Sequence, residues 1–272
     1  MRAIVSKARV GSVLVAVLVV AGLVLAACGS SANTSTSTSS GSAQTETFTW
    51  ACSGALPPFS YVENGKLQGF DVAIGNALAQ KMGMTPHPVT NPFETIVNGL
   101  TASKFDAIIS TLSITPERQQ VVNFSTPYIK SDVQIYVSAD NTTINGPSDL
   151  KGKKIGCQKA STYIPLAQKA TGNPKDVVSY SSDIYALQDL VEGRTDAVIT
   201  DNVTGALAIK KGLAIKPVGA PFTSSYEAIA VRKDDPALLK KINVALAEIM
   251  KDGTYKALCL KWVGQVLMPG VN

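Results

Sequence analysis

The sequence predicts an α/β protein with two lobes, in which each lobe is an open, mostly parallel sheet flanked by helices and two strands form a hinge. Apolar segments of strand length alternate with amphipathic segments of helical length, a pattern typical of parallel sheets covered by helices. A passage near residue 100 recurs ninety residues later, so a similar unit is used twice. The last strand returns to the first unit, and two crossings between lobes make a hinge beside a cleft.

The first lobe is predicted to alternate strands and helices from Thr47 onward. The segment Gly69-Phe70-Asp71 is expected to cap a helix from Val72 to Met82, whose apolar residues recur at a spacing of four on one face. Asn91 is expected to cap the next helix, with Glu94 reaching back as in a capping box. The other elements expected here are strands at Thr47 to Ala51, Phe105 to Ile109 and Tyr226 to Val231, a tight turn at Glu63 to Lys66, and helices beginning at Pro116, Pro236 and Tyr255.

The second lobe is predicted to follow the same plan. Its first strand, Val133 to Val137, alternates polar with apolar residues. Asn202 to Lys211 is predicted to be a helix that ends at Gly212. The other elements expected here are strands at Ile155 to Cys157, Val177 to Tyr180 and Ala197 to Thr200, and helices opening at Ala160-Ser161-Thr162 and running from Ser182 to Glu192.

Two strands of similar sequence are expected to end at one polar site. Leu100 to Ser110 aligns with Leu190 to Thr200 through a shared leucine, a basic residue, Asp-Ala, two apolar residues and a hydroxyl. The next residue is Thr111 in the first copy and Asp201 in the second. Open parallel sheets bind ligands at the carboxyl ends of their strands, so both ends would face one cleft. The alternative is that the two lobes share this text for packing alone.

The end of the first of these strands carries groups that suit a small anion. Thr115-Pro116 starts a helix whose first amides are free, and Arg118 supplies a guanidinium that can hold a carboxylate with two parallel hydrogen bonds. With Asp201 at the opposite end, an α-amino acid would bridge the two. The hydroxyls expected beside Arg118 are those of Ser110, Thr111 and Ser113.

The first residues are predicted to be a lipoprotein signal. A basic start precedes the apolar run Val10 to Ala27, and the run ends in Leu25-Ala26-Ala27-Cys28, where small residues precede a cysteine that would be lipidated. Multiple acyl chains on Cys28 would hold the protein at a membrane surface. The alternatives are a plain secretory signal and an uncleaved helical anchor.

The domain boundaries follow from composition and from the two crossings. Ser30 to Gln44 is almost entirely Ser, Thr, Gly, Ala and Asn and cannot form a core, so it is expected to be a flexible tether or, alternatively, a mucin-like stalk. The expected parts are the signal peptide 1–27, the tether 28–46, the first lobe 47–131 with 226–272, and the second lobe 132–225.

Composition argues against two classes of partner. Without the three basic residues of the leader, 22 basic residues face 20 acidic ones and no long basic run remains, so nucleic acid is not expected to bind. The later cysteines, Cys52, Cys157 and Cys259, lack CxxC spacing, and the one histidine, His87, is expected at a strand edge in a structural role. No metal site is therefore expected. At most one internal disulfide can form among these cysteines, and Cys52–Cys259 is a possibility because both would belong to the first lobe.

Several spaced motifs together resemble the polar amino-acid solute-binding proteins of ABC importers. They occur in the family's order and span essentially the whole mature domain. The resemblance implies a two-lobed periplasmic-binding-protein fold that closes over its ligand. The motifs are Phe59-Ser60-Tyr61, Gly65 to Asp71, Phe105 to Arg118, Phe124 to Tyr128 and Gly193 to Asp201.

The resemblance assigns a role to individual residues. Arg118 matches the arginine that forks onto the ligand α-carboxylate, and Asp201 matches the aspartate that takes the α-ammonium. Phe93, expected at a helix N-terminus and pointing along the end of the sheet, matches the wall against the ligand side chain. Thr111 and Ser113 match contacts beside the carboxylate, Ser110 matches a neighbouring contact, and Ser161 and Thr162 match a second-lobe loop that closes on the carboxylate.

One departure from the family bears on specificity. Members that bind basic amino acids have an acidic residue where this chain has Ser53, and an aromatic residue where it has Leu56. Without a second carboxylate, a cationic ligand side chain would lack a partner. The sequence therefore favours a neutral side chain, unless Glu63, Glu94 or a second-lobe residue enters the pocket.

The expected function is capture of a free amino acid and its delivery to ABC permease subunits. The protein would act as a lipid-anchored monomer in the cell envelope, on the outer face of the cytoplasmic membrane or on the periplasmic side, without a cofactor and without catalysis. One alternative is a sensing receptor domain with the same lobes, and another is a dehydratase-like enzyme on the same fold, although no His–Ser–Asp or Cys–His arrangement is present. For Arg118, the alternative role is a structural salt bridge with Glu117 or Asp132.

Overall fold

The computed structural model describes residues 45–271. The predicted signal peptide 1–27, the lipidation site Cys28 and most of the tether lie outside the described residues. Within 45–271, every helix is too short or too polar to cross a membrane.

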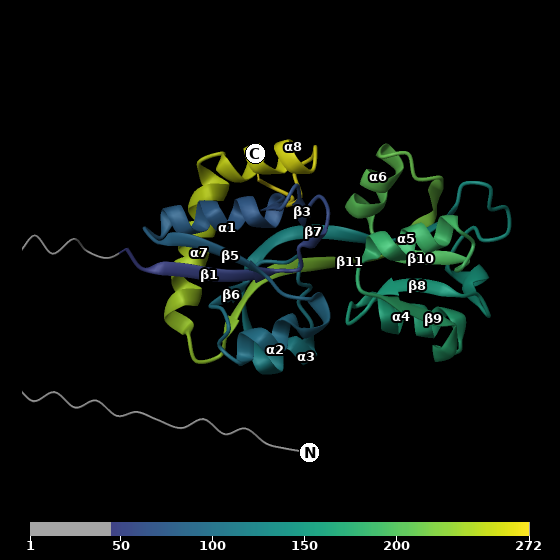
Figure 1. Ribbon diagram of the computed structural model, residues 1–272, viewed down its shortest axis with the longest axis horizontal. Coiled ribbons are helices and arrows are strands. Elements are labelled where there is room, and N and C mark those ends of the chain that lie inside the picture. Colours follow the sequence, from purple (N-terminus) through teal and green to yellow (C-terminus); the bar gives the residue numbers. More distant parts are fainter. Residues whose placement is uncertain (1–44, 272) are drawn as a thin grey trace, which may run out of the picture. The chain divides into compact units, whose positions relative to one another are not determined.

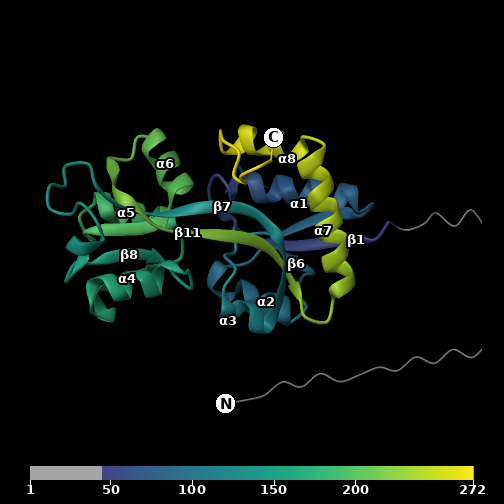
Figure 2. The same ribbon diagram turned by 180° about the vertical axis from the view of Figure 1, so that it is seen from behind.

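Two long antiparallel strands connect the lobes. β7 (Val122–Ser138) and β11 (Ile215–Arg232) pair with each other and lie at the centre of an eight-stranded sheet, in the order β5-β1-β6-β11-β7-β10-β8-β9. Figures 1 and 2 show both strands running from one lobe into the other. Within this eight-stranded sheet, the strands that belong to one lobe only are parallel to one another, as predicted. The sequence predicts only Val133 to Val137 of β7 and Tyr226 to Val231 of β11, because polar residues in the middle of both strands interrupt the apolar pattern.

The first lobe has helices on both faces of its part of the sheet. Along β1, Phe48 and Trp50 point into a core formed with α1, α7 and α8, whereas Ala51 points into a smaller core with α2. This alternation is the two-residue period of a strand. The elements are β1 (Thr47–Cys52), β2 (Ala55–Leu56), β3 (Ser60–Glu63), β4 (Lys66–Gln68), α1 (Phe70–Lys81), β5 (Thr85–Thr90), the short 3-10 helix Phe93–Thr95, α2 (Ile96–Thr101), β6 (Ala107–Ile108), α3 (Pro116–Val121), α7 (Pro236–Lys251) and α8 (Thr254–Trp262).

The second lobe repeats this three-layer plan. Ile199 of β10 packs with α4 on one face, and Val198 packs with α5 and α6 on the other. β10 is thus buried on both faces, which agrees with its nearly continuous apolar sequence. The elements are the 3-10 helices Pro147–Leu150 and Pro174–Asp176, β8 (Ile155–Gln158), α4 (Tyr163–Thr171), β9 (Val177–Tyr180), α5 (Asp183–Val191), β10 (Ala197–Asp201) and α6 (Asn202–Lys210).

The repeated Asp-Ala motif has the same structural role in both lobes. The Asp106 carboxylate accepts a hydrogen bond from the Thr49 amide at 2.9 Å, and the Asp196 carboxylate accepts one from the Lys154 amide at 2.7 Å. In each lobe the aspartate joins the start of one parallel strand to the start of its neighbour. The repeat therefore fixes the register of two equivalent strand pairs.

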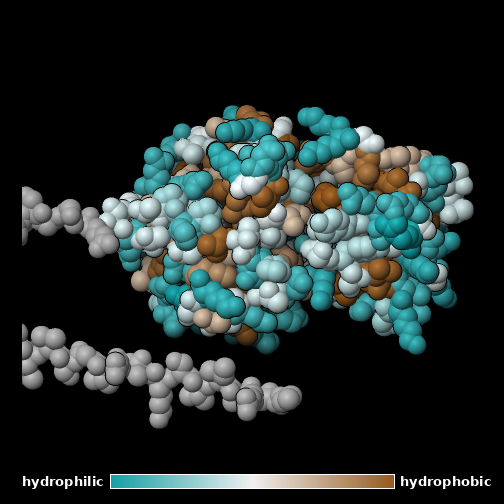
Figure 3. Space-filling model, in the orientation of Figure 1, coloured by the Kyte–Doolittle hydropathy of each residue, from teal (hydrophilic) through white to brown (hydrophobic). Residues whose placement is uncertain are grey.

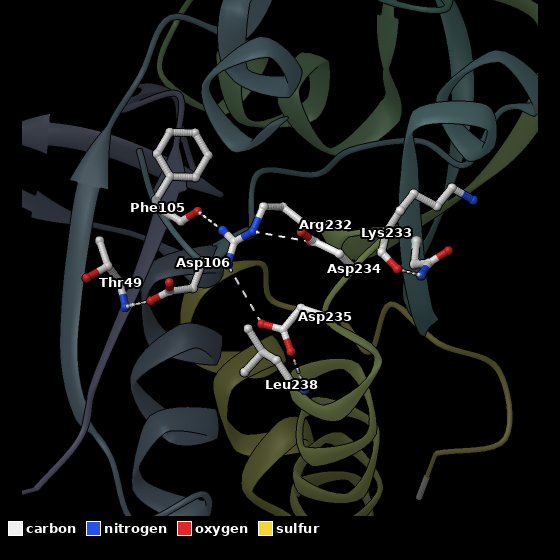
Figure 4. A network of polar contacts seen from close by, with 9 residues as sticks. Thr49, Phe105, Asp106, Arg232, Lys233, Asp234, Asp235 and Leu238 are labelled. Atoms are coloured by element: carbon white, nitrogen blue, oxygen red, sulfur yellow. Dashed lines mark hydrogen bonds and ion pairs between the residues drawn. The ribbon is translucent and has the colours of Figure 1, made fainter. Parts of the chain in front are cut away.

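Arg232 ties the end of β11 to the rest of the first lobe (Figure 4). Its Nη1 donates to the Phe105 carbonyl at 2.8 Å, and its guanidinium lies 3.7 Å from Asp234 and 3.8 Å from Asp235. Asp235 also caps α7 by accepting from the Leu238 amide at 3.0 Å. These contacts fix the beginnings of β6 and α7 at the edge of the sheet remote from the carboxyl ends of the strands.

One local expectation was wrong, and one pairing that the sequence left open does not form. Asn91 does not cap a helix; its Nδ2 donates to the Pro92 carbonyl at 2.9 Å and to Thr95 Oγ1 at 3.0 Å, and it holds a 3-10 turn instead. Cys52 and Cys259 do not form the possible disulfide; each is a free, buried thiol. His87 lies exposed on the edge strand β5, where it was expected.

The surface is mixed rather than dominated by one apolar face. On the side drawn in Figure 3, hydrophilic residues dominate and hydrophobic ones form separate patches. Isolated exposed apolar side chains are normal for folded proteins.

The contact between α1 and β1 predicts a stability effect at Gly75. A Cβ at Gly75 would overlap the indole ring of Trp50, which is fully buried. Gly75→Ala should lower the free energy of unfolding by about 1–3 kcal/mol in urea denaturation, although alanine favours helices by about 1 kcal/mol. Gly146→Ala is the matched control, because no atom lies within 4 Å of its added Cβ. Equal stabilities of the two variants would contradict this packing.

Candidate functional site

A strained threonine marks the carboxyl end of the first repeated strand. Thr111 has φ of 49°, a left-handed conformation that is costly for a β-branched residue. Its amide donates to Tyr128 Oη at 3.1 Å, and its Oγ1 donates to Asp71 Oδ2 at 2.9 Å. Tyr128 Oη in turn donates to Asp71 Oδ1 at 2.7 Å. Asp71, fully buried in α1, thus holds the threonine in its strained conformation.

Arg118 lies where the two lobes meet. The Thr115 hydroxyl accepts from the Arg118 amide at 3.2 Å and caps α3, as predicted. The guanidinium donates from Nη1 to the Ser113 carbonyl at 2.7 Å, and from Nη2 to the second-lobe Ala160 carbonyl at 3.1 Å. Within residues 45–271, Arg118 forms no salt bridge with an acidic side chain, so the structural alternative with Glu117 or Asp132 was wrong.

The aromatic neighbour of Arg118 is Phe93. The Arg118 Cζ lies 5.8 Å from the ring centroid, within cation–π range. Phe93 is 8% exposed and belongs to the smaller core of the first lobe, with Ile96 and Leu112. The expectation that Phe93 points away from the core was therefore wrong, because the short 3-10 helix turns the ring inward.

The loop before α4 brings the second-lobe hydroxyls to Arg118. Ala160 has φ of 61°, which turns its carbonyl toward the arginine. Ser161 is buried; its Oγ donates to the Gln158 carbonyl at 2.7 Å and accepts from the Tyr163 amide at 3.3 Å. Thr162 is half-buried immediately before α4. Both predicted loop residues thus directly follow Ala160, the second-lobe residue that accepts a hydrogen bond from Arg118.

Asp201 ends the second repeated strand and caps α6. Its Oδ1 accepts from the Thr204 amide at 2.8 Å, and its side chain is only 1% exposed. Burial raises the pKa of Asp201, and hydrogen bonds from the start of α6 act against that rise. Within the described chain, Asp201 has no cationic side chain as a salt-bridge partner.

Ser53 and Leu56 lie on the first-lobe loop that contacts the second lobe. The Ser53 amide donates to Ser110 Oγ at 3.0 Å, which joins two predicted site residues, and Leu56 is buried. The neighbouring Ala55 carbonyl accepts from Ser182 Oγ of the second lobe at 2.7 Å. Together with the contact between Arg118 and Ala160, this bond joins the first lobe directly to the second.

Three buried carboxyl groups at this junction were not predicted from the sequence. Asp71 is on α1, Asp183 begins α5 and Glu227 is on β11; none is more than 2% exposed. Burial is the main cause that raises the pKa of Asp71 to about 6, of Asp183 to about 7 and of Glu227 to about 7, and the charge of Asp201 adds to each. Burial, followed by the charges of Asp201, Asp183 and Glu227, raises the pKa of Tyr163 well above its usual value.

The three groups carried different sequence signals. Asp71 stands in the motif with Gly69 and Phe70, where the sequence predicts a helix cap and gives no sign of a buried carboxyl group. Asp183 follows Ser182, which caps α5 by accepting from the Ile184 amide at 3.2 Å, so it resembles an ordinary first-turn acid. Glu227 falls in the hinge strand, and strand pairing had to be known before its direction could be inferred.

These carboxyls predict that stability falls as pH rises. Because their pKa values are higher in the folded state, the native protein binds more protons than the unfolded chain, and this contribution is present below about pH 4 and lost through about pH 6–7. Urea denaturation of ligand-free protein should therefore give a lower free energy of unfolding at about pH 7 than at about pH 5.

Glu227→Gln is the control for this pH dependence. It removes one titrating group, so the difference between the two pH values should shrink. A stability that rises across this window in the wild-type protein would contradict the assigned direction of the pKa shifts.

Comparison with known proteins identifies the family. The chain matches the family model for bacterial extracellular solute-binding proteins, family 3, over residues 48–265. It is 35% identical over 255 residues to the probable amino-acid-binding protein YxeM of Bacillus subtilis, covering 92% of this chain and 94% of that protein. It is 36% identical over 215 residues to the L-cystine-binding protein TcyJ of Escherichia coli, covering 78% and 80%.

A solved structure agrees with the sequence matches. An ancestral arginine-binding protein bound to glutamine is 38% identical, with a TM-score of 0.76 over 80% of this chain and 98% of that chain. The predicted two-lobed periplasmic-binding-protein fold is thereby confirmed. The chain belongs to the bacterial extracellular solute-binding proteins, family 3.

Proposed function

We propose that this protein captures a free α-amino acid between its lobes and delivers it, chemically unchanged, to the permease subunits of an ABC importer. The observation that carries the proposal is the presence of two opposite charges on the two lobes, Arg118 on the first and Asp201 on the second. Each is a charged group near the junction, and neither forms an ion pair within residues 45–271. An α-carboxylate and an α-ammonium group would satisfy both charges at once.

In this proposal Arg118 binds the carboxylate and Asp201 binds the ammonium group. Two guanidinium nitrogens donate to the Ser113 and Ala160 carbonyls, and the remaining N–H groups are available to a ligand. Since Ala160 belongs to the second lobe, Arg118 would couple ligand binding to closure. The further ligand contacts proposed are Ser110, Thr111, Ser113, Ser161, Thr162, Phe93, Ser53 and Leu56.

The first lobe is proposed to comprise residues 47–131 and 226–272, and the second lobe residues 132–225. The protein is proposed to act as a monomer and to catalyse no reaction. YxeM and TcyJ are named as binding proteins, which supports the absence of catalysis. A single species of monomer mass in size-exclusion chromatography with light scattering would support the monomer; a dimer would refute it.

The ligand side chain is the finer question. Ser53 and Leu56 are uncharged, which supports a neutral side chain at that end of the cleft. The prediction of a neutral side chain also assumed that no second carboxylate reaches the cleft, and the buried carboxyls of Asp183 and Glu227 argue against that assumption.

A thermal-shift screen against the common amino acids tests the proposed function. One or a few α-amino acids should raise the melting temperature of protein that has been unfolded, dialysed and refolded to remove bound ligand. Arg118→Ala should lose this response while its ligand-free melting temperature changes little, because the guanidinium makes only two hydrogen bonds and no ion pair in the described chain. An Arg118→Ala variant with unchanged affinity would refute the carboxylate role.

The ammonium role has its own measurement. Asp201→Asn should weaken binding of the α-amino acid more than binding of its α-keto analogue, which lacks the ammonium group. Equal losses for both compounds would refute the assignment to Asp201.

The proposed anchor is a lipidated Cys28 followed by the tether. Wild-type protein should fractionate with membranes, and Cys28→Ser should release it, because the acyl chains supply the membrane affinity. Detergent extraction of the wild-type protein is the positive control. Membrane association that persists in Cys28→Ser would favour an uncleaved helical anchor.

A further inference from the structure

Glu227 lies on the strand pair that joins the lobes. Its backbone pairs with Ile129 of β7 on one side and forms an isolated bridge with Ser113 on the other. Ser113 is the residue whose carbonyl accepts from Arg118. Glu227 is therefore adjacent, through the backbone, to the loop that positions the proposed carboxylate-binding group.

The side chain of Glu227 emerges on the same face as Asp201. On β7, Asp201 pairs with Val133 and Glu227 pairs with Ile129, and these positions differ by an even number of residues. Side chains that alternate along a strand return to the same face every two residues, so both carboxyls lie on one face. The Ser131 hydroxyl, between those two positions, donates to Glu227 Oε1 at 3.1 Å and confirms the direction.

One oxygen of Glu227 is satisfied and the other is not. Oε1 accepts from Ser131 and from Ser225, whereas the buried Oε2 has no hydrogen-bond partner within the described chain. The residue is only 2% exposed. Burying an ionised carboxylate with one free oxygen is costly unless a cation or a donor completes it.

Two of the groups that face Glu227 make this cost larger. Asp201 of β10 and Asp71 of α1 place like charges near it. The phenols of Tyr163 on α4 and Tyr128 on β7 also lie near enough for the charge of Glu227 to help raise their pKa values. Within residues 45–271, no lysine or arginine forms a salt bridge with any of these carboxyls. The fold thus gathers negative charge at this face of the hinge without supplying a counter-charge.

The carboxyls do not form a cluster that could hold one small metal ion. No group of three or more His, Cys, Asp or Glu side chains in the described chain is arranged to hold a metal. Asp183, whose Oδ1 is likewise buried without a partner, belongs to α5 of the second lobe. Charges distributed in this way around a closed junction suit an organic ligand with positive charge at more than one point.

We infer that Glu227 is a second cation-binding group of the cleft and that it selects α-amino acids whose side chain is positively charged. This inference rests on the proposed function, in which Asp201 already holds the α-ammonium group. Oε2 of Glu227 would accept from the side-chain cation, while Oε1 keeps its two serine hydroxyls. The preference would then come from the hinge strand rather than from the first-strand loop that contains Ser53.

Paired isosteric ligands test the inference. Arginine and citrulline differ in charge but little in shape, and both retain the α-carboxylate and α-ammonium groups. In isothermal titration calorimetry of refolded, ligand-free protein, arginine should bind on the order of 30-fold or more tightly than citrulline, as expected when a buried charge pair is formed. Lysine and 2-aminoheptanoic acid, in which a methyl group replaces the side-chain ammonium group, provide a second pair with the same expected order.

Glu227→Gln should reduce arginine binding on the order of 30-fold or more and change citrulline binding much less. Glu248→Gln, on the exposed face of α7, is the matched control and should leave both affinities unchanged. Retained citrulline binding shows that Glu227→Gln is folded and that the α-amino-acid site is intact.

The outcomes separate the two proposals. If Glu227→Gln lowers both affinities equally, or if wild-type protein binds each neutral isostere as tightly as its cationic partner, the inference about Glu227 is overturned and the proposed function stands. If no α-amino acid binds to wild-type protein, the proposed function itself is refuted.

Discussion

The antiparallel pairing of β7 with β11 determines where every group of the site can lie. Since both strands run through both lobes, the carboxyl ends of β6 and β10 are held in one continuous sheet. The pairing of Ser131 with Ser225 lies at the middle of this connection. It sets the side-chain parity that brings Asp201 and Glu227 to one face. A shift of one residue would turn Glu227 to the opposite face and remove it from the junction.

Burying the carboxyl groups of this site is costly where their oxygens lack hydrogen-bond partners. Asp71 is largely compensated, because Thr111 and Tyr128 both donate to it. Asp183 and Glu227 each keep a buried oxygen without a partner in the described chain. A cationic ligand would remove part of this cost, so that affinity would come from relief in the protein as well as from new contacts. Buried groups without partners lower the folding stability of a protein at the site where it binds its ligand.

The sequence predicted the parts of the fold that depend on local pattern. The helices α1 and α7, the parallel strands and the equivalence of the two Asp-Ala motifs follow from periodicity and repetition. The family motifs also led us to expect Arg118 beside Ser113 and opposite the second-lobe loop, and Arg118 does donate to the carbonyls of Ser113 and of Ala160 in that loop. The direction of Phe93 was not predictable, since it depends on a 3-10 turn held by Asn91 rather than on a regular helix.

The carboxyls at the hinge were missed for a related reason. Glu227 stands in a segment with weak alternation, and β11 contains register shifts on both sides of Thr223–Glu227. The face on which its side chain emerges is therefore fixed only by pairing with β7, ninety-eight positions away at Ile129. Periodicity is visible in the sequence only within a single element, whereas this site is formed by β7 and β11, which are distant in the chain and run antiparallel. The specificity of such a cleft can consequently change through a hinge residue while every predicted binding motif stays the same.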